Sequence, residues 1–306
     1  AVGYNAGTLV TTGVNNTLIG GLAGDALTTG SDNDAIGVST LSTETAGNKS
    51  TAIGRGALNA QNNSTSTDVY NVAVGYLAGL SVTTGIQNTL IGGLAGDALT
   101  DADFNVALGY SALGAATTSD GNTAIGRFAL LSDTQGNLSV AVGRDALRAQ
   151  NFTTDVDAYN VAVGGLAGTA VTTGIKNVLV GGLAGDALTD ADFNVAMGNN
   201  ALTSDTLGSR SVAIGNSALL TQNFTTATDT YNTAVGDNAG RAVTTGQYNT
   251  LIGALAGDAT TTGNNNVAMG YSSLTTNILS DRNVAIGNFA LASLNHTTST
   301  DAYNVG

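Results

Sequence analysis

The sequence predicts an all-β protein, a parallel β-solenoid in which each turn of the chain, here called a coil, is one short repeat. A tripeptide of Ala or Leu, an aliphatic residue and Gly recurs along the 306 residues in steps of 17, with three steps of 21. The repeats leave no unrelated segment. Seventeen residues are too few for a helical hairpin repeat, but they suit one coil of a solenoid.

The first residue of each tripeptide, called the anchor, serves as the reference point of its coil. It is Ala in thirteen coils and Leu in four, namely Leu18, Leu90, Leu179 and Leu251. The Leu coils share one phrase: NTLIGGLAGDALT occupies 16–28 and 88–100, and close copies occupy 177–189 and 249–261. An active site needs one copy of a motif, whereas a fibre needs many.

The residue two positions after the anchor is Gly in every coil, which indicates a corner with positive φ or a close approach of two backbones. The residue two positions before the anchor is Asn in thirteen coils, with a fourteenth Asn at Asn304 before Gly306, and Ser in three, Ser50, Ser139 and Ser211. Equivalent residues of successive coils lie about 4.8 Å apart, so equal side chains form columns. We therefore expect structural ladders, with Asn amides bonded to one another: Gly75, Gly92, Gly109, Gly126, Asn71, Asn88, Asn105 and Asn122.

Side chains alternate along a strand, so in NVAVG the side chains of Val72 and Val74 point one way and that of Ala73 the other. We interpret the two valines as interior, which places Ile91, Leu108 and Ile125 in one internal column and turns the anchors outward. A strand that is apolar on both faces is normally buried on both. We therefore expect the outer face to pack against another chain; a broader flat sheet within one chain is the alternative.

A higher order divides the chain into blocks, 1–72, 73–161, 162–233 and 234–305, within one repetitive β-solenoid rod that spans 1–306. Each block closes with a coil of 21 residues that carries a Tyr near its end. The four long coils share an N-x-S/T sequon, a pattern for glycosylation on exposed loops, at Asn62, Asn151, Asn223 and Asn295. These loops and their tyrosines are the expected place for a glycan or protein receptor.

The formal charge of −13, with only nine Lys and Arg, argues against a nucleic-acid partner. It also disfavours docking to anionic lipid. Cys is absent, which excludes disulfides and thiolate metal sites and is compatible with an extracellular protein. No apolar run reaches the length of a membrane span, so no membrane insertion is expected.

Catalysis needs unlike groups that converge, and the repeats offer few. His296 is the only His, so neither a Ser–His pair nor a His-based metal site can form, and we expect no enzyme and no cofactor. The stretch DADFN resembles the start of a calcium loop, but it lacks the turn Gly and the distal Glu. Solvated turn carboxylates are the main interpretation, and weak Ca²⁺ sites are the alternative, at Asp101, Asp103, Asp190 and Asp192.

The segments NVAVGYLAG (71–79), NTAIGRFAL (122–130) and NVAIGNFAL (283–291) resemble the head repeats of trimeric autotransporter adhesins, which are YadA-like. Similar arrays occur in bacteriophage tail fibres. The adhesin resemblance implies a left-handed parallel β-roll, a homotrimer and cell adhesion outside the cell. This chain differs in its longer unit, 17 residues rather than about 14, and in its regular long coils.

Together these features predict a non-enzymatic structural and adhesive rod of an extracellular fibre, at a cell surface or on a virion. Copies of the chain are the expected partners, side by side as a homotrimer or end to end as a filament. One alternative is a bacteriophage tail-fibre shaft involved in host recognition. A second is a polymerised extracellular matrix filament.

Overall fold

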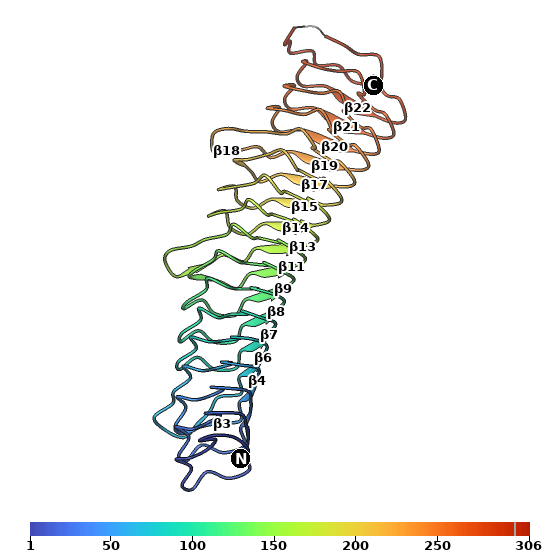
Figure 1. Ribbon diagram of the computed structural model, residues 1–306. Coiled ribbons are helices and arrows are strands. Elements are labelled where there is room, and N and C mark those ends of the chain that lie inside the picture. The colour runs from blue at the N-terminus through green and yellow to red at the C-terminus, as the bar shows by residue number, and fades with distance from the viewer. Residues whose placement is uncertain (297) are drawn as a thin grey trace. The chain divides into compact units, whose positions relative to one another are not determined.

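The computed structural model describes residues 1–296 and 298–306 and forms a parallel β-solenoid in two compact units, Ala1–Ala158 and Tyr159–Gly306. Within each unit, successive coils each contribute one strand to a single row in which neighbouring strands are parallel, and the first coil contributes an isolated bridge, Val2↔Ile19 (Figure 1). Partner residues are 17 apart, as in Thr17↔Asp34, or 21 apart across a long coil, as in Thr51↔Val72. The described residues contain no helix. The predicted fold class is confirmed.

The main row of the first unit consists of β1 (Thr17–Ile19), β2 (Asp34–Ile36), β4 (Thr51–Ile53), β6 (Val72–Val74), β7 (Thr89–Ile91), β8 (Val106–Leu108), β9 (Thr123–Ile125) and β11 (Val140–Val142). That of the second consists of β13 (Val161–Val163), β14 (Val178–Val180), β15 (Val195–Met197), β17 (Val212–Ile214), β19 (Thr233–Val235), β20 (Thr250–Ile252), β21 (Val267–Met269) and β22 (Val284–Ile286).

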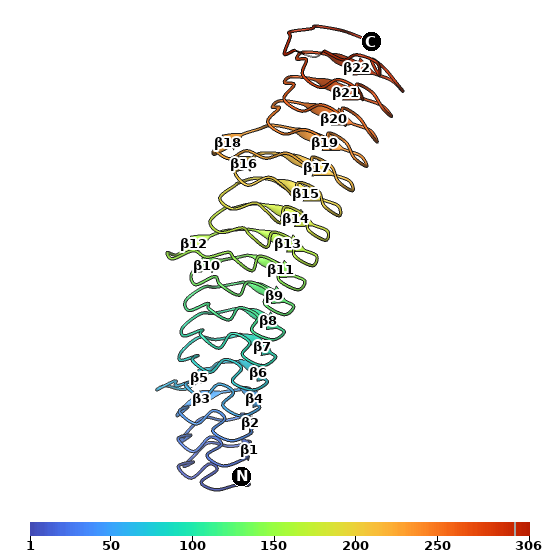
Figure 2. The ribbon, with the colours of Figure 1, turned by 45° about the horizontal axis from the view of Figure 1, so that its top comes forward.

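Each of three long coils adds a short parallel pair beside the protruding loop, away from the main row (Figure 2). In the first unit these pairs are β3 (Gly47–Asn48) with β5 (Thr67–Asp68) and β10 (Gly136–Asn137) with β12 (Val156–Asp157). In the second unit β16 (Gly208–Ser209) pairs with β18 (Thr228–Asp229).

The anchors form the core, which reverses the expected orientation of the strands. Ala73 and Leu90 are fully buried, whereas Leu108 in the neighbouring outer column is 42% exposed. Ile91, Leu108 and Ile125 do form one continuous column in register, but that column faces outward, so its placement in the interior was wrong. The interior is thin, and small Ala side chains fit it where paired Val and Ile would not.

The Asn column lies on the same side of the strand as the anchors and is buried with them. The side-chain Oδ1 of Asn71 accepts from the backbone N–H of Asn88 at 2.8 Å, and Nδ2 of Asn71 donates to the carbonyl of Gly85 at 2.7 Å. Amide-to-amide contacts are longer, as in the 3.2 Å bond from Asn105 to Asn88. The ladder therefore links side chains mainly to the backbone of the next coil, satisfying groups that water cannot reach.

The anchor leucines are accommodated by glycines six positions after an anchor. A Cβ atom on Gly240 or on Gly257 would lie 2.7 Å from a methyl of Leu251, so one Leu fills the space above two glycines. Around the Ala anchor Ala213, Leu202 and Leu219 occupy the two corresponding positions, whereas an Ala anchor next to a Leu coil, such as Ala234, has one Leu and one Gly there. The segment that occurs four times therefore places a large side chain at the anchor and small residues six positions after an anchor. This swap keeps the packing density of the core constant.

Candidate interaction surface

Each strand presents two outward side chains, one just before and one just after its anchor. We call these two columns the sheet face. The column after the anchor is always Val, Ile, Leu or Met, and the column before it is Val or Thr except at Asp34. Leu108 and Met197 expose 42% and 40% of their surface, although neighbours in the column shade each of them. Contiguous apolar surface of this extent on a soluble protein typically marks an interaction site.

Two further outward columns flank the sheet face. The entry rim is the residue three before the anchor, and the exit rim is the residue three after it. All nine Tyr of the chain stand in these rims, at Tyr70, Tyr159, Tyr231, Tyr248 and Tyr303 and at Tyr4, Tyr76, Tyr110 and Tyr271. Seven of the nine cations stand there too: Lys49, Lys176, Arg210, Arg282, Arg55, Arg127 and Arg144. The rims are therefore the most aromatic and most basic parts of an acidic chain.

The entry rim of the second unit is an exposed ladder of rings and cations. Its residues have left-handed backbone angles, such as φ of 58° at Phe193 and 63° at Arg210, and their N–H groups bond to the preceding coil. The Arg210 guanidinium lies 4.8 Å from the ring centroid of Phe193 and 5.9 Å from that of Tyr231. Tyr231 stacks on Tyr248 at 5.7 Å. Cation–π and stacking contacts thus hold these side chains in fixed positions.

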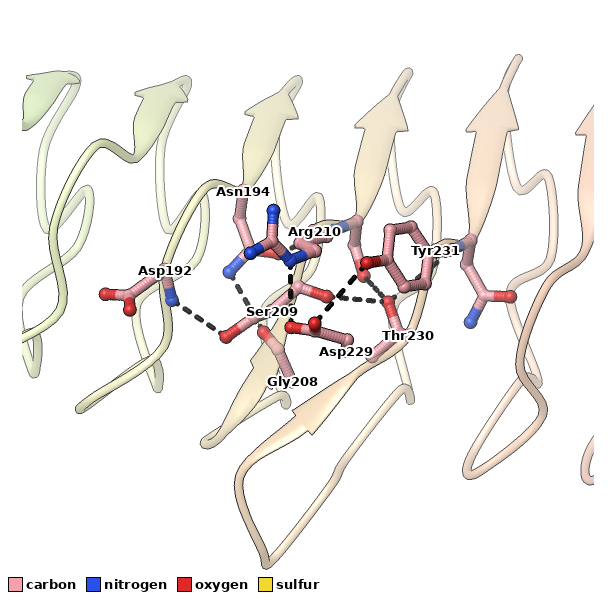
Figure 3. Close-up of polar contacts among 10 residues, drawn as sticks. Asp192, Asn194, Gly208, Ser209, Arg210, Asp229, Thr230 and Tyr231 are labelled. Carbon is pink, nitrogen blue, oxygen red and sulfur yellow. Dashed lines mark hydrogen bonds and ion pairs between the residues drawn. The ribbon is translucent and has the colours of Figure 1, made fainter.

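At the long coils the entry rim also carries ion pairs. Figure 3 shows Arg210 bonded to Asp229 at 3.0 Å, and the hydroxyl of Tyr231 donating to the same carboxylate at 3.4 Å. Lys49 repeats the arrangement, donating to Asp68 at 2.6 Å and to the hydroxyl of Tyr70 at 3.0 Å. In these two blocks the contacts attach the end of the protruding loop to the coil before it.

The two charges of the Lys49 pair stabilise each other. The hydrogen bond from Lys49 lowers the pKa of the Asp68 carboxyl, and the hydrogen bonds to Asp68 and Tyr70 raise the pKa of Lys49. At the last long coil the charge of Asp301, followed by that of Tyr303, raises the pKa of Arg282. All of these groups are exposed, so each pair adds little to the free energy of unfolding and serves to orient the loop.

The exit rim has its own cluster in the first unit. Arg127 stacks over Phe128 at 4.4 Å, and Arg148 approaches the same ring at 5.5 Å. Asp145, whose side chain is only 10% exposed, lies 3.6 Å from Arg144 and 3.8 Å from Arg148. The cluster holds three Arg and one carboxylate, which contacts two of them, so the cluster is basic.

Beneath three long coils lies a buried carboxylate that sequence reasoning missed. Glu44 is fully buried, and its carboxylate accepts from the N–H groups of Thr45, Ala46, Gly47 and Asn63 at 2.7–3.1 Å and from Nε2 of Gln61 at 2.9 Å. Neutral donors compensate the charge, and no ion pair among the described residues includes Glu44. Gln61 also donates to Ser50 at 3.0 Å.

The same arrangement recurs in the next two blocks, with Asp133, Gln150 and Ser139, and with Asp205, Gln222 and Ser211. The three serines that interrupt the Asn column therefore make room for the glutamine. The last block differs at all three positions, where Asn277, Leu294 and Asn283 stand. The sequence contained a signal for this buried site, because each of the three serines stands two positions before the anchor of a long coil.

The candidate calcium ligands belong to a second ladder. Oδ1 of Asp103 accepts from the N–H of Ile86 at 2.7 Å, and Oδ1 of Asp192 accepts from that of Ile175 at 2.8 Å. Asp101 and Asp190 accept from Thr hydroxyls. Burial, assisted by the charges of Asp120 and Asp101, raises the pKa of Asp103 although its backbone bond opposes the shift. No group of three metal-ligating side chains gathers in the described part of the chain.

The sequons of the long coils begin at exposed residues. Oδ1 of Asn62, Asn151 and Asn223 accepts from a Thr hydroxyl of the preceding coil at 3.3, 3.0 and 3.1 Å. Asn295 is also exposed, but Thr297, which completes its sequon, lies outside the described residues.

The described surface, 1–296 and 298–306, contains no pocket. A search of the same residues for a membrane-spanning helix found no candidate.

No relative emerged. Comparisons of the chain with protein-family models, with curated proteins and with solved structures each gave no match.

Proposed function

We propose that this chain is a non-enzymatic structural segment of an extracellular fibre that associates with further copies of itself through the sheet face. One observation carries the proposal: an exposed apolar face runs through successive coils, flanked by rims that hold every Tyr and most of the Arg. Tyr and Arg are enriched at the energetically dominant positions of protein interfaces, where Lys, Glu and Asp are depleted.

Charge favours this face over any other. Of the 22 Asp and Glu, only Asp32, Asp34 and Asp237 stand in the sheet face or its rims. Two copies that each carry −13 repel one another, so they approach most easily where acidic residues are fewest. Burying the apolar columns against a copy would remove them from water at about 25 cal/mol per Å². The repeat supplies matching columns on both partners.

A homotrimer of copies that lie side by side is compatible with this face, whereas an end-to-end filament would join copies along the stack and not through it. The resemblance of the repeats to adhesin heads supports the trimer, an attachment role and a cell-surface location. The absence of Cys is compatible with that location. A tail-fibre shaft would use the same surface, whereas a matrix filament built end to end would not. A glycan or protein receptor would bind at the protruding loops.

Sedimentation velocity tests the proposal with the variant Leu108→Asp/Met197→Asp, which places one carboxylate on the sheet face of each unit. An unpaired charge in an apolar interface costs about 3–5 kcal/mol, so the dissociation constant should rise at least about 100-fold. Thr29→Asp/Thr245→Asp adds the same charge at exposed positions away from the face and is the control. A wild-type chain that remains monomeric at all accessible concentrations would contradict the proposal.

A further inference from the structure

In the second block the exit rim is basic, and the surface beside the entry rim is acidic on the next coil. On the exit side, Arg127 and Arg144 stand on consecutive coils. The Arg144 side chain is 60% exposed, and that of Arg148 beside it is 52% exposed. Asp145 contacts both Arg144 and Arg148, which leaves the cluster with a net positive charge. Stacking on Phe128 holds Arg127 in place, so its charge is presented at a fixed position.

On the entry side of these coils an expected cation is missing. Lys49, Arg210 and Arg282 stand on the entry rim one coil before the long coils of the other blocks, whereas the second block has Leu138, which is 40% exposed. The long coil brings Asp155 and Asp157 beside this position, where Nδ2 of Asn137 donates to both carboxylates at 2.6 and 3.3 Å. Both aspartates are exposed. This end of the coil is therefore acidic.

We propose that the neighbouring copy in the fibre runs parallel to the first, and that Arg127 and Arg144 of one copy bind Asp155 and Asp157 of the next. This inference rests on the proposed function. A symmetry axis along the stack places the exit rim of one copy opposite the entry rim of its neighbour at the same coil. A two-fold axis across the stack would instead oppose Arg to Arg.

Carboxylates of a second copy suit this basic cluster better than a long polyanion does. The chain carries −13 in total, so an extended polyanion would be repelled along most of its length. A pair of aspartates on one loop meets only the local positive field. Arg binds carboxylate in a bidentate geometry, which fixes register as well as strength. The apolar sheet face repeats at every coil and cannot select a register alone, whereas a charge pattern that occurs once can.

Sedimentation velocity on two charge-matched variants tests the ion pairs. Arg127→Gln/Arg144→Gln should weaken association about tenfold, and the difference from wild type should shrink as salt is added. Thr29→Glu/Thr245→Glu reaches the same net charge from exposed positions outside both rims, and its association should stay near that of wild type. An equal loss in both variants would mean that net charge alone matters, which would overturn the proposal.

An experiment that mixes two variants of opposite charge gives the decisive test. Copies with Arg127→Asp/Arg144→Asp and copies with Asp155→Arg/Asp157→Arg, carrying different labels, should each associate poorly alone. The first kind then offers acidic groups on both sides of the sheet face and the second offers basic groups on both sides, so the mixture should form labelled hetero-assemblies. Circular dichroism melts confirm that each variant is folded.

If the two variants form no mixed assemblies, the proposal that ion pairs join neighbouring copies is overturned. If Leu108→Asp/Met197→Asp still dissociates wild-type assemblies in that case, the sheet-face function survives without them. A monomeric wild type overturns both proposals.

Discussion

The corner glycine Gly126 has φ of 136° and faces the backbone of the next coil. A Cβ atom there would lie 2.4 Å from the carbonyl oxygen of Gly143, closer than any tolerated contact. Both the backbone angle and the close approach exclude a side chain, so the invariance of this column within the chain has a physical cause.

Gly126→Val should therefore lower the free energy of unfolding by at least about 3 kcal/mol, since the backbone of two coils must separate to admit the side chain. Denaturant unfolding followed by circular dichroism measures the loss. Gly93→Ala is the matched control, because a Cβ there meets nothing closer than 3.6 Å, and it should change stability by less than about 1 kcal/mol. Equal effects of the two substitutions would refute the assignment of the corner.

The orientation of the strands shows where prediction from single residues succeeded and where it failed. Alternation within NVAVG was predicted, but apolar residues on both sides left the choice of the inner side open. The Asn column could have decided it, because Asn71 and Ala73 share one side of the strand and an amide ladder is strongest away from water. The wrong choice came from ranking Val above Ala as a core residue, which holds for thick cores but not for a thin coil.

Neighbouring coils pack together because a large core side chain in one coil faces small residues in the next. Around Leu251, glycines in its own coil and in the coil before leave room for the large anchor, whereas Ala213 sits beneath Leu202 and Leu219. The two arrangements fill the same volume with different residues. Leu tolerates the position of these glycines, because φ is 49–54° at Leu202 and Leu219 and 57° at Gly240.

Leu251→Ala should cost about 2–5 kcal/mol of unfolding free energy because it opens a cavity above both glycines. Gly257→Leu should also destabilise, because its side chain would overlap with that of Leu251. The triple variant Leu251→Ala/Gly240→Leu/Gly257→Leu reproduces the packing around Ala213 and should recover most of the loss. Thermal melts of the four proteins measure this coupling. Additive losses in the triple variant would show that the exchange of volume is not the reason for the pattern.

The candidate surface was predictable only in part. Self-association was expected from a strand apolar on both sides, and that expectation stands as a proposal, but the residues assigned to the contact were the wrong ones. The rims were not foreseen, because Tyr and Arg are scattered in sequence and form columns only after the long coils are aligned. The sequence analysis did not single out Asp205, since Gln222, which donates to it, and Ser211, to which Gln222 also donates, lie in two different coils.

At the scale of the whole molecule, each coil contacts its immediate neighbours through the same bonds along each unit, as in Val72 N–H to Asn88 O and Val178 N–H to Asn194 O, both at 2.8 Å. Stability in such an array is close to a sum of coil and neighbour terms. No single coil is then indispensable for the folding of the others.

Removal of the whole block 162–233 should therefore leave a folded protein with an unchanged denaturant midpoint to within about 10%, because Val161 is again followed by an Ala anchor, Ala234. Removal of 162–225 breaks the register of the columns and should unfold the coils around the junction. Circular dichroism and limited proteolysis distinguish the two products. If the first deletion unfolds as extensively as the second, nearest-neighbour stacking is not the source of stability.

The buried carboxylate beneath the protruding loops has a practical consequence for anyone who wishes to lengthen this array. A loop-bearing coil grafted alone would bring Gln222 without Asp205 and Ser211, which stand on the preceding coil. The buried amide of Gln222 would then face an Asn and lose both of its acceptors. The smallest transferable cassette is thus a pair of coils, the plain one first. Insertions of a loop for display on this scaffold should follow that pairing.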